Sequence, residues 1–246
     1  MTLGRHRWQA LGSLVASVVL LTACGSPDTT DSADQGQDDM SAPSATLSPA
    51  GASAGCTEPP VVPSARTMES LEAPEGEVTG TWTGTIDTNC GPLEVELFGD
   101  KAPTTVASFK HLAEAGYWVD SPCHRLTTQG IFVLKCGDPS GTGRGAPGYT
   151  FGIENAPEDG HYPPGTLAMA RSQDPNSNGG QFFIVYEDTE LPVEGGGYSI
   201  FGKVTSGMDI VDRVAQQGVD GGGADGTPAA PISILSVEVT QEKASE

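Results

Sequence analysis

The chain has 246 residues, of which 37% are hydrophobic, and a formal net charge of −20 at pH 7. This length and composition allow one sizeable domain with a hydrophobic core. The strong negative charge would repel phosphate backbones, so it argues against nucleic-acid binding.

The first 23 residues have the composition of an export signal. Arg5 and Arg7 give a positive start, and the apolar run from Leu11 to Leu21 is too short to span a bilayer. Small residues directly before Cys24 resemble the bacterial lipobox, in which the cysteine thiol becomes acylated. We therefore predict a lipoprotein signal peptide over residues 1–23 and an extracytoplasmic protein anchored to the cell membrane through lipidated Cys24. A plain secretory signal or an uncleaved anchor is the alternative.

Two segments of irregular composition follow. Residues 24–55 are rich in Ser, Asp, Thr, Ala, Gly, Gln and Pro, and such a stretch buries too little apolar surface to offset its ordering entropy. We predict a disordered acidic tether here. Residues 56–77 are Pro-rich and are predicted to wrap the domain surface as an irregular N-terminal arm. The folded domain is expected over residues 78–242.

The domain begins with alternating apolar and polar residues. This pattern in Thr81–Asp87 and Leu93–Phe98 predicts a hairpin of two half-buried strands. Apolar residues at helical spacing predict a helix over Pro103–Ala115, with Thr104 or Asp100 as its cap.

The rest of the domain is expected to contain mostly short strands. Cys123–Thr127 and Ile131–Cys136 form a second hairpin candidate. Many short strands with two helices and no alternating strand-helix repeat favour a mainly β fold, a closed antiparallel barrel capped by helices. The remaining predicted elements are strands at Thr166–Arg171, Gln181–Tyr186, Tyr198–Val204 and Ile232–Val239, and a helix at Met208–Gln216.

Four sequence motifs occur in the order typical of one family. They are His124-Arg125-Leu126, Gly137-Asp138-Pro139, Gly179 to Ile184, and Phe201-Gly202-Lys203-Val204. In this order they resemble the cyclophilins, which are peptidyl-prolyl cis/trans isomerases. The resemblance implies a closed eight-stranded antiparallel barrel capped by two α-helices, and a reaction that needs no cofactor.

The resemblance also implies a catalytic residue. Rotation about an X-Pro bond is slow because amide resonance raises a barrier of about 18–20 kcal/mol. A guanidinium that donates to the prolyl nitrogen weakens this resonance in the transition state. By resemblance Arg125 is this donor; for a lone arginine, an exposed salt-bridge partner would be the ordinary interpretation.

A substrate groove is implied beside Arg125. Phe132, Val133, Phe183 and Leu191 match an apolar pocket for the proline ring, although such residues can also be ordinary barrel core. Lys135 stands where many family members carry Gln, and this places a second positive charge near the arginine. His124 is interpreted as a structural hydrogen-bonding side chain that helps to position the hairpin. The predicted substrate-binding residues are His124, Phe132, Val133, Lys135, Ala170, Arg171, Gln181, Phe183, Leu191 and Tyr198.

Four cysteines remain once Cys24 is assigned to the lipid, and an even number in an exported chain suggests disulfides. Three pairings are possible, and we hypothesise Cys123–Cys136 across the hairpin and Cys56–Cys90 at the N-terminal arm. The absence of a CxxC pair argues against a metal site.

Two functions are compatible with this sequence. The first is an isomerase that acts on proline-containing segments of exported or cell-surface proteins, working as a monomer. The second is a binding module that holds such segments without useful turnover, and Lys135 favours it. A solute-binding lipoprotein lacks support, because the chain is too short for two lobes.

Overall fold

The computed structural model describes residues 48–62 and 70–241. The predicted signal peptide, Cys24 and most of the predicted tether lie outside these residues. Within the described part, no helix is both long enough and apolar enough to cross a membrane.

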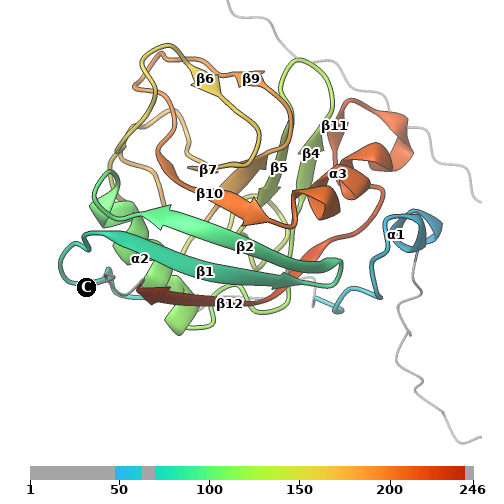
Figure 1. Ribbon diagram of the computed structural model, residues 1–246, viewed down its shortest axis with the longest axis horizontal. Helices are drawn as coiled ribbons and strands as arrows, with labels where there is room; N and C mark the ends of the chain where they lie inside the picture. Colours follow the sequence, from blue (N-terminus) through green and yellow to red (C-terminus); the bar gives the residue numbers. More distant parts are fainter. Residues whose placement is uncertain (1–47, 63–69, 242–246) are drawn as a thin grey trace, which may run out of the picture. The chain divides into compact units, whose positions relative to one another are not determined.

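One antiparallel sheet of ten strands dominates the described residues and curls into a half-barrel (Figure 1). The predicted closed eight-stranded barrel is therefore wrong. The two end strands, β11 and β3, are only two residues long, and they do not pair with each other in the described part of the chain. The strand order is β11 (Asp225–Gly226), β4 (Arg125–Thr127), β5 (Val133–Cys136), β8 (Phe182–Val185), β7 (Thr166–Met169), β10 (Ile200–Ser206), β2 (Gly91–Phe98), β1 (Thr81–Thr88), β12 (Ser233–Gln241) and β3 (Ser121–Pro122).

The long hairpin β1–β2 forms where the alternation predicted it. Ile86 lies opposite Leu93, and both side chains are buried. The turn between the strands depends on Gly91, whose φ of 120° suits a residue without a Cβ. A separate two-stranded sheet joins β6 (His161–Tyr162) to β9 (Thr189–Glu190).

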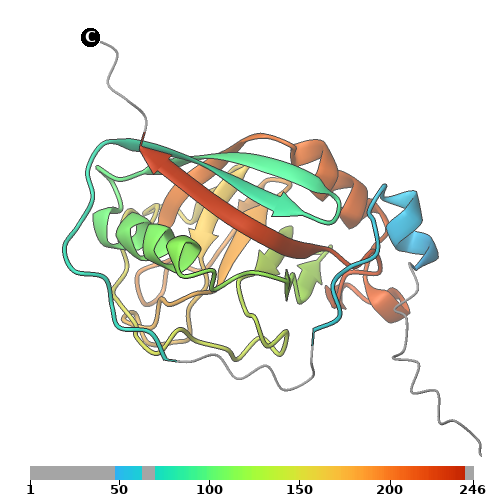
Figure 2. The ribbon, with the colours of Figure 1, turned by 90° about the horizontal axis from the view of Figure 1, so that it is seen from below.

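Three α-helices occur among the described residues, one more than predicted: α1 (Pro49–Ser53), α2 (Pro103–Glu114) and α3 (Met208–Gln216). Helix α2 lies along β12 (Figure 2). The predicted capping of α2 by Thr104 or Asp100 is wrong, because Asp100 instead accepts a hydrogen bond from Gly80 N. The first amides of α2, those of Thr104 and Thr105, donate to the carboxylate of Glu154 at 3.0 and 2.8 Å. A distant acidic side chain therefore satisfies the helix N-terminus.

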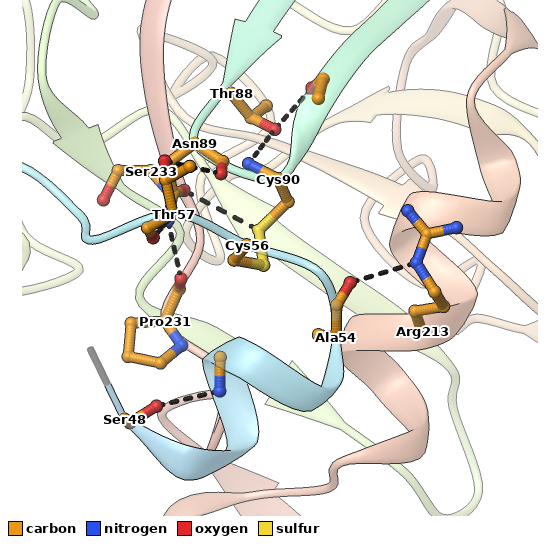
Figure 3. Close-up of a disulfide and its surroundings, with 12 residues drawn as sticks. Ser48, Ala54, Cys56, Thr57, Thr88, Asn89, Cys90, Arg213, Pro231 and Ser233 are labelled. Carbon is orange, nitrogen blue, oxygen red and sulfur yellow. Dashed lines mark hydrogen bonds between the residues drawn. A yellow bond between two sulfur atoms is a disulfide. The ribbon is translucent and has the colours of Figure 1, made fainter.

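Helix α1 corrects the predicted extent of the tether, because residues 48–55 are folded. Ser48 caps the helix by accepting a hydrogen bond from Gly51 N at 2.9 Å, and proline is the first helical residue. Ala54 is fully buried, and its carbonyl accepts a hydrogen bond from Arg213 Nε of α3 (Figure 3). The disulfide Cys56–Cys90 then joins the arm to the β1–β2 turn (Figure 3).

Both hypothesised disulfides, Cys56–Cys90 and Cys123–Cys136, are present. The second one links the residue before His124 to the end of β5. It therefore closes the hairpin that carries Arg125 and Lys135.

The sheet buries apolar side chains on both of its faces. On one face, the rings of Phe109, Trp118, Phe182 and Phe201 pack together, and the centroids of Phe109 and Trp118 lie 4.6 Å apart. The other face carries a smaller cluster that includes Phe183. Adjacent residues of a strand point to opposite faces, so Phe182 belongs to the main core and Phe183 to the second cluster.

Candidate active site

The strand register gathers the predicted site on this second face. Arg125 of β4 lies opposite Lys135 of β5, which lies opposite Phe183 of β8, which lies opposite Ala168 of β7. Directly opposed residues of antiparallel strands share a face of the sheet. Four strands therefore place a cation, a second cation, an aromatic ring and a small side chain in one row.

A small cavity of about 100 Å³ opens on this row. Its floor is apolar, because Val133 and Phe183 are buried and Leu191 and Tyr198 are half-buried. Eight of the predicted site residues line it: Arg125, Val133, Lys135, Ala170, Arg171, Phe183, Leu191 and Tyr198.

Phe132 is the predicted pocket residue that lies elsewhere. Its ring packs edge-on against Tyr186 at a centroid distance of 5.9 Å and lines a different cavity near α3. Ile131 lines the small cavity in its place. The alternation of Ile131, Val133 and Lys135 on one face of the strand was the sequence signal that could have identified it.

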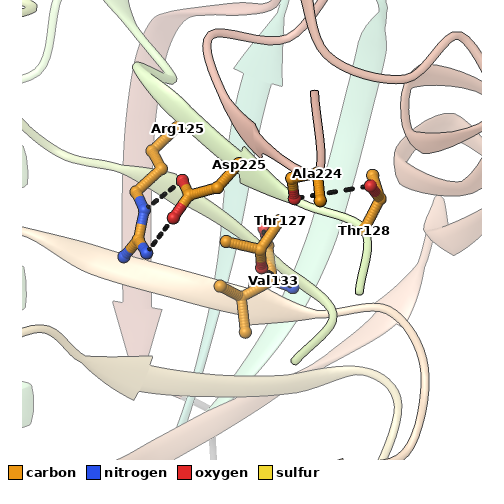
Figure 4. A network of polar contacts seen from close by, with 6 residues as sticks. All are labelled: Arg125, Thr127, Thr128, Val133, Ala224 and Asp225. Atoms are coloured by element: carbon orange, nitrogen blue, oxygen red, sulfur yellow. Dashed lines mark hydrogen bonds and ion pairs between the residues drawn. The ribbon is translucent and has the colours of Figure 1, made fainter. Parts of the chain in front are cut away.

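Arg125 is held by a residue that the sequence analysis missed. Its Nε and Nη2 donate to the two carboxylate oxygens of Asp225, each at 2.7 Å (Figure 4). Strand β11 places Asp225 beside β4, 100 residues away along the chain. The hydrogen bonds from Arg125 lower the pKa of Asp225, and the same contact raises the pKa of Arg125. The guanidinium is therefore charged and fixed in orientation.

Lys135 faces Arg125 without an acidic partner. Its ammonium makes no ion pair with any described residue, and it is half-buried. Burial, and then the charge of Arg125, lower the pKa of Lys135. Like charges placed directly opposite each other on a sheet repel. Asp225 offsets this repulsion on the arginine side.

A larger cavity of about 270 Å³ adjoins the small one, since Lys135, Ala170 and Arg171 line both. The loop 143–146 forms one wall of it. Buried Asp138 holds this loop, because its carboxylate accepts hydrogen bonds from Ser140 N, Arg144 N and Gly145 N at 2.8 to 3.1 Å. Burial opposes the ionisation of Asp138, but hydrogen bonds from Ser140 and Gly145 outweigh it and lower the pKa.

Gln181 lies in this larger cavity and not against Arg125. Its Nε2 donates to the carbonyl of Gly145 at 2.8 Å. Its Oε1 is buried and accepts no hydrogen bond from the described residues. An acceptor is thus available for an N–H group of a ligand.

His124 lines neither of these cavities, so its predicted place in the substrate groove is wrong. Its ring lies beneath Gly143 of the loop, and neither ring nitrogen is hydrogen-bonded to a described residue. The predicted role as a hydrogen-bonding side chain is therefore wrong. Burial, followed by the charge of Lys135, lowers the pKa of His124 to about 4. The imidazole is therefore neutral at pH 7 and supports the loop by packing.

Together these residues offer hydrogen-bond donation from a permanently charged group beside an apolar cavity. Arginine keeps its charge in a partly apolar site. The described residues contain no cluster of three or more His, Cys, Asp or Glu side chains that could hold a metal ion.

Comparisons with known proteins find similar domains. The model of the cyclophilin type peptidyl-prolyl cis-trans isomerase family matches residues 83–239. The Probable peptidyl-prolyl cis-trans isomerase B of Mycobacterium tuberculosis is 44% identical over 163 residues, which cover 61% of this chain and 52% of that protein. Its namesake in Mycobacterium leprae is 40% identical over 173 residues, covering 65% and 57%. The chain thus spans about half the length of the curated relatives it matches.

A solved structure shares the fold. The crystal structure of a cyclophilin-type isomerase from Cryptosporidium parvum, obtained in the presence of the dipeptide Ala-Pro, is 33% identical. It matches with a TM-score of 0.55 over 65% of this chain and 99% of that one. The chain therefore belongs to the cyclophilin-type peptidyl-prolyl cis-trans isomerase family.

Proposed function

We propose that this protein accelerates cis/trans isomerisation of X-Pro bonds. The observation that supports this most strongly is the position of the Arg125 guanidinium at the edge of an apolar cavity lined by Val133, Phe183 and Leu191. A pyrrolidine ring in that cavity brings the prolyl nitrogen next to the arginine. Donation to the nitrogen then favours the twisted transition state, in which the lone pair is localised, over either planar isomer.

Asp225 leaves part of the guanidinium available for this role. Its carboxylate accepts hydrogen bonds from Nε and Nη2, and Nη1 makes no hydrogen bond with the described residues. The Nη1 N–H groups therefore remain available to a substrate while the ion pair keeps the plane of the guanidinium in place. The reaction moves no proton to or from the enzyme, so it needs no general base.

The test is an isomerisation assay of the full chain on a short Ala-Pro peptide, in which NMR exchange measures the rate of cis/trans interconversion. Arg125→Ala should lower kcat/KM by about a hundredfold, because the charge that stabilises the transition state is removed. Arg125→Lys should restore little, since an ammonium lacks the planar paired donors. Lys101→Ala, a change outside both cavities, is the matched control. Equal rates for wild type and Arg125→Ala would refute the catalytic role.

A proline-peptide binding module is the second candidate, and Lys135 favours it. This half-buried ammonium lies beside the arginine, where it can bind a peptide carbonyl without contributing to bond rotation. The same NMR samples separate the two functions. Peptide-dependent shifts around Phe183 with no increase in the exchange rate would support binding alone.

We also propose that the protein acts outside the cytoplasm, as a monomer, on proline-containing segments of exported or cell-surface proteins. Two disulfides in a chain of this size support an oxidising compartment. Labelling with a radioactive fatty acid, followed by membrane fractionation, tests the anchor. The wild-type protein should carry the label and occur in the membrane fraction. The Cys24→Ser variant should carry no label and should be absent from the membrane fraction. Label retained by Cys24→Ser would refute lipidation at this cysteine.

A further inference from the structure

Positive charge is concentrated in the groove of an otherwise acidic protein. The described residues contain eight lysines and arginines, and four of them line the two adjoining cavities: Arg125, Lys135, Arg144 and Arg171. No aspartate or glutamate lines either cavity. Three of the four cations outside the groove are paired with carboxylates: Lys110 with Glu114, Lys203 with Glu96, and Arg213 with Asp209. Of the four described cations inside it, only Arg125 has such a partner, Asp225.

The cations of the larger cavity are not neutralised in the described part of the chain. Lys135 makes no ion pair, and the side chain of Arg144 is exposed and makes neither a hydrogen bond nor an ion pair there. Arg171 donates only to backbone carbonyls, including that of Gly197 at 2.6 Å, and stacks over the Tyr198 ring at 4.9 Å. These partners carry no net charge. The Asp138 carboxylate keeps its charge beneath the loop and partly offsets that of Lys135, but its oxygens accept hydrogen bonds from the loop and it makes no ion pair with a described cation.

The position of these charges relative to a bound proline follows from the cavities. Lys135 and Arg171 line both cavities, so they stand at the junction between them. Arg144 lies on the far wall of the larger cavity. A peptide whose proline occupies the small cavity can extend from it into the larger one, where its side chains meet these three cations.

We propose that the groove selects X-Pro segments that carry a carboxylate side chain, Asp or Glu, in the two residues before proline. This selection rests on the proposed isomerase function of the same groove. Lys135 has already lost part of its hydration through burial, so a carboxylate that approaches it displaces little more water. The cationic groove also raises the local concentration of acidic segments, which the acidic remainder of the surface would otherwise repel.

Three acetylated and amidated peptides test the selection, identical except for Glu, Gln or Lys two residues before proline. The Glu peptide should have a kcat/KM about tenfold above that of the Lys peptide at low salt, with Gln between them. This ratio should shrink toward one in about 0.5 M salt, because exposed charges are then screened. The double variant Lys135→Gln/Arg144→Gln should lose most of the ratio, whereas Lys101→Gln should keep it. A ratio near one in wild type, or a ratio unchanged in the double variant, would overturn the proposal.

A titration of the same peptides, observed by NMR, distinguishes this inference from the proposed function. Tighter binding of the Glu peptide without any acceleration would support charge selection and reject the isomerase. Equal affinities and equal rates for all three peptides, with normal turnover, would reject charge selection and leave the isomerase standing.

Discussion

The ion pair between Asp225 and Arg125 should contribute more to catalysis than to folding. Both hydrogen bonds are 2.7 Å long, but the two side chains are 43% and 53% exposed. Water therefore screens the pair, and Asp225→Asn should lower the free energy of unfolding by at most about 1 kcal/mol. A free arginine side chain carries about 2 kcal/mol of rotamer entropy. If the ion pair removes half of this entropy before substrate binds, about 1 kcal/mol of the cost of ordering Arg125 is already met. Loss of the ion pair should then lower kcat/KM by about fivefold.

The repulsion from Lys135 makes the effect of Asp225 dependent on its neighbour. In a Lys135→Gln background the like charge is gone, so Asp225→Asn should lower kcat/KM by less than in wild type, and the double-mutant cycle measures the difference. NMR exchange with a neutral Ala-Pro peptide gives the rates, and urea unfolding gives the stabilities. Asp209→Asn, which breaks the Arg213 pair on α3, is the matched control for losing an exposed ion pair. An Asp225→Asn variant with unchanged kcat/KM would show that this carboxylate is only a surface partner.

Three further predictions concern residues around the site. Ile131→Ala should lower kcat/KM by about tenfold, because it enlarges the proline pocket; Phe132→Ala should instead reduce stability by about 2 kcal/mol with little kinetic effect, since its ring packs on Tyr186. If Phe132→Ala lowered kcat/KM and Ile131→Ala lowered only the free energy of unfolding, Phe132 and not Ile131 would be the pocket residue. The pKa of His124 falls from 6.5 to about 4 on folding, so the unfolded chain binds more protons between these values. The part of the free energy of unfolding that depends on a neutral His124 is thus fully present above pH 6.5, and it is lost as the pH falls toward 4. A urea series should show that His124→Asn removes about 3 kcal/mol of this loss by about pH 4, and parallel pH profiles for both proteins would contradict it. Glu154→Gln should destabilise α2 by about 1–2 kcal/mol, as reported by hydrogen exchange of the Thr104 and Thr105 amides. Unchanged exchange would mean that water replaces the carboxylate.

Local pattern and family motifs predicted most of the strands and the face on which the site lies. The alternation of β1 and β2 and the helical spacing of α2 are local signals, and both elements formed within a residue or two of their predicted bounds. The motifs also named Arg125, Lys135 and Phe183, which the strand register brings together on one face of the sheet. The prediction for Phe132 was wrong because Ile131, Val133 and Lys135 alternate onto the pocket face, so the Phe132 ring lies on the other side, against Tyr186.

Contacts between residues far apart in the chain left no comparable signal. Asp225 lies in a Gly-rich stretch, and only the pairing of β11 with β4 brings it to Arg125. Glu154 reaches α2 from about 50 residues away. The open edges of the sheet also depend on long-range pairing, which no local pattern specifies. Helix α1 did have a local signal, a serine cap followed by proline, but the surrounding low-complexity composition obscured it.

The bond between Cys56 and Cys90 has a mechanical consequence. Tension applied to the chain from its N-terminal side reaches α1 first and then the sulfur bridge, which passes it into the rigid β1–β2 turn. Residues 57–89 lie within the covalent loop that this bridge closes, so a steady pull cannot peel them from the domain without breaking a covalent bond. The groove is built on β4, β5, β7 and β8, which all lie outside this loop.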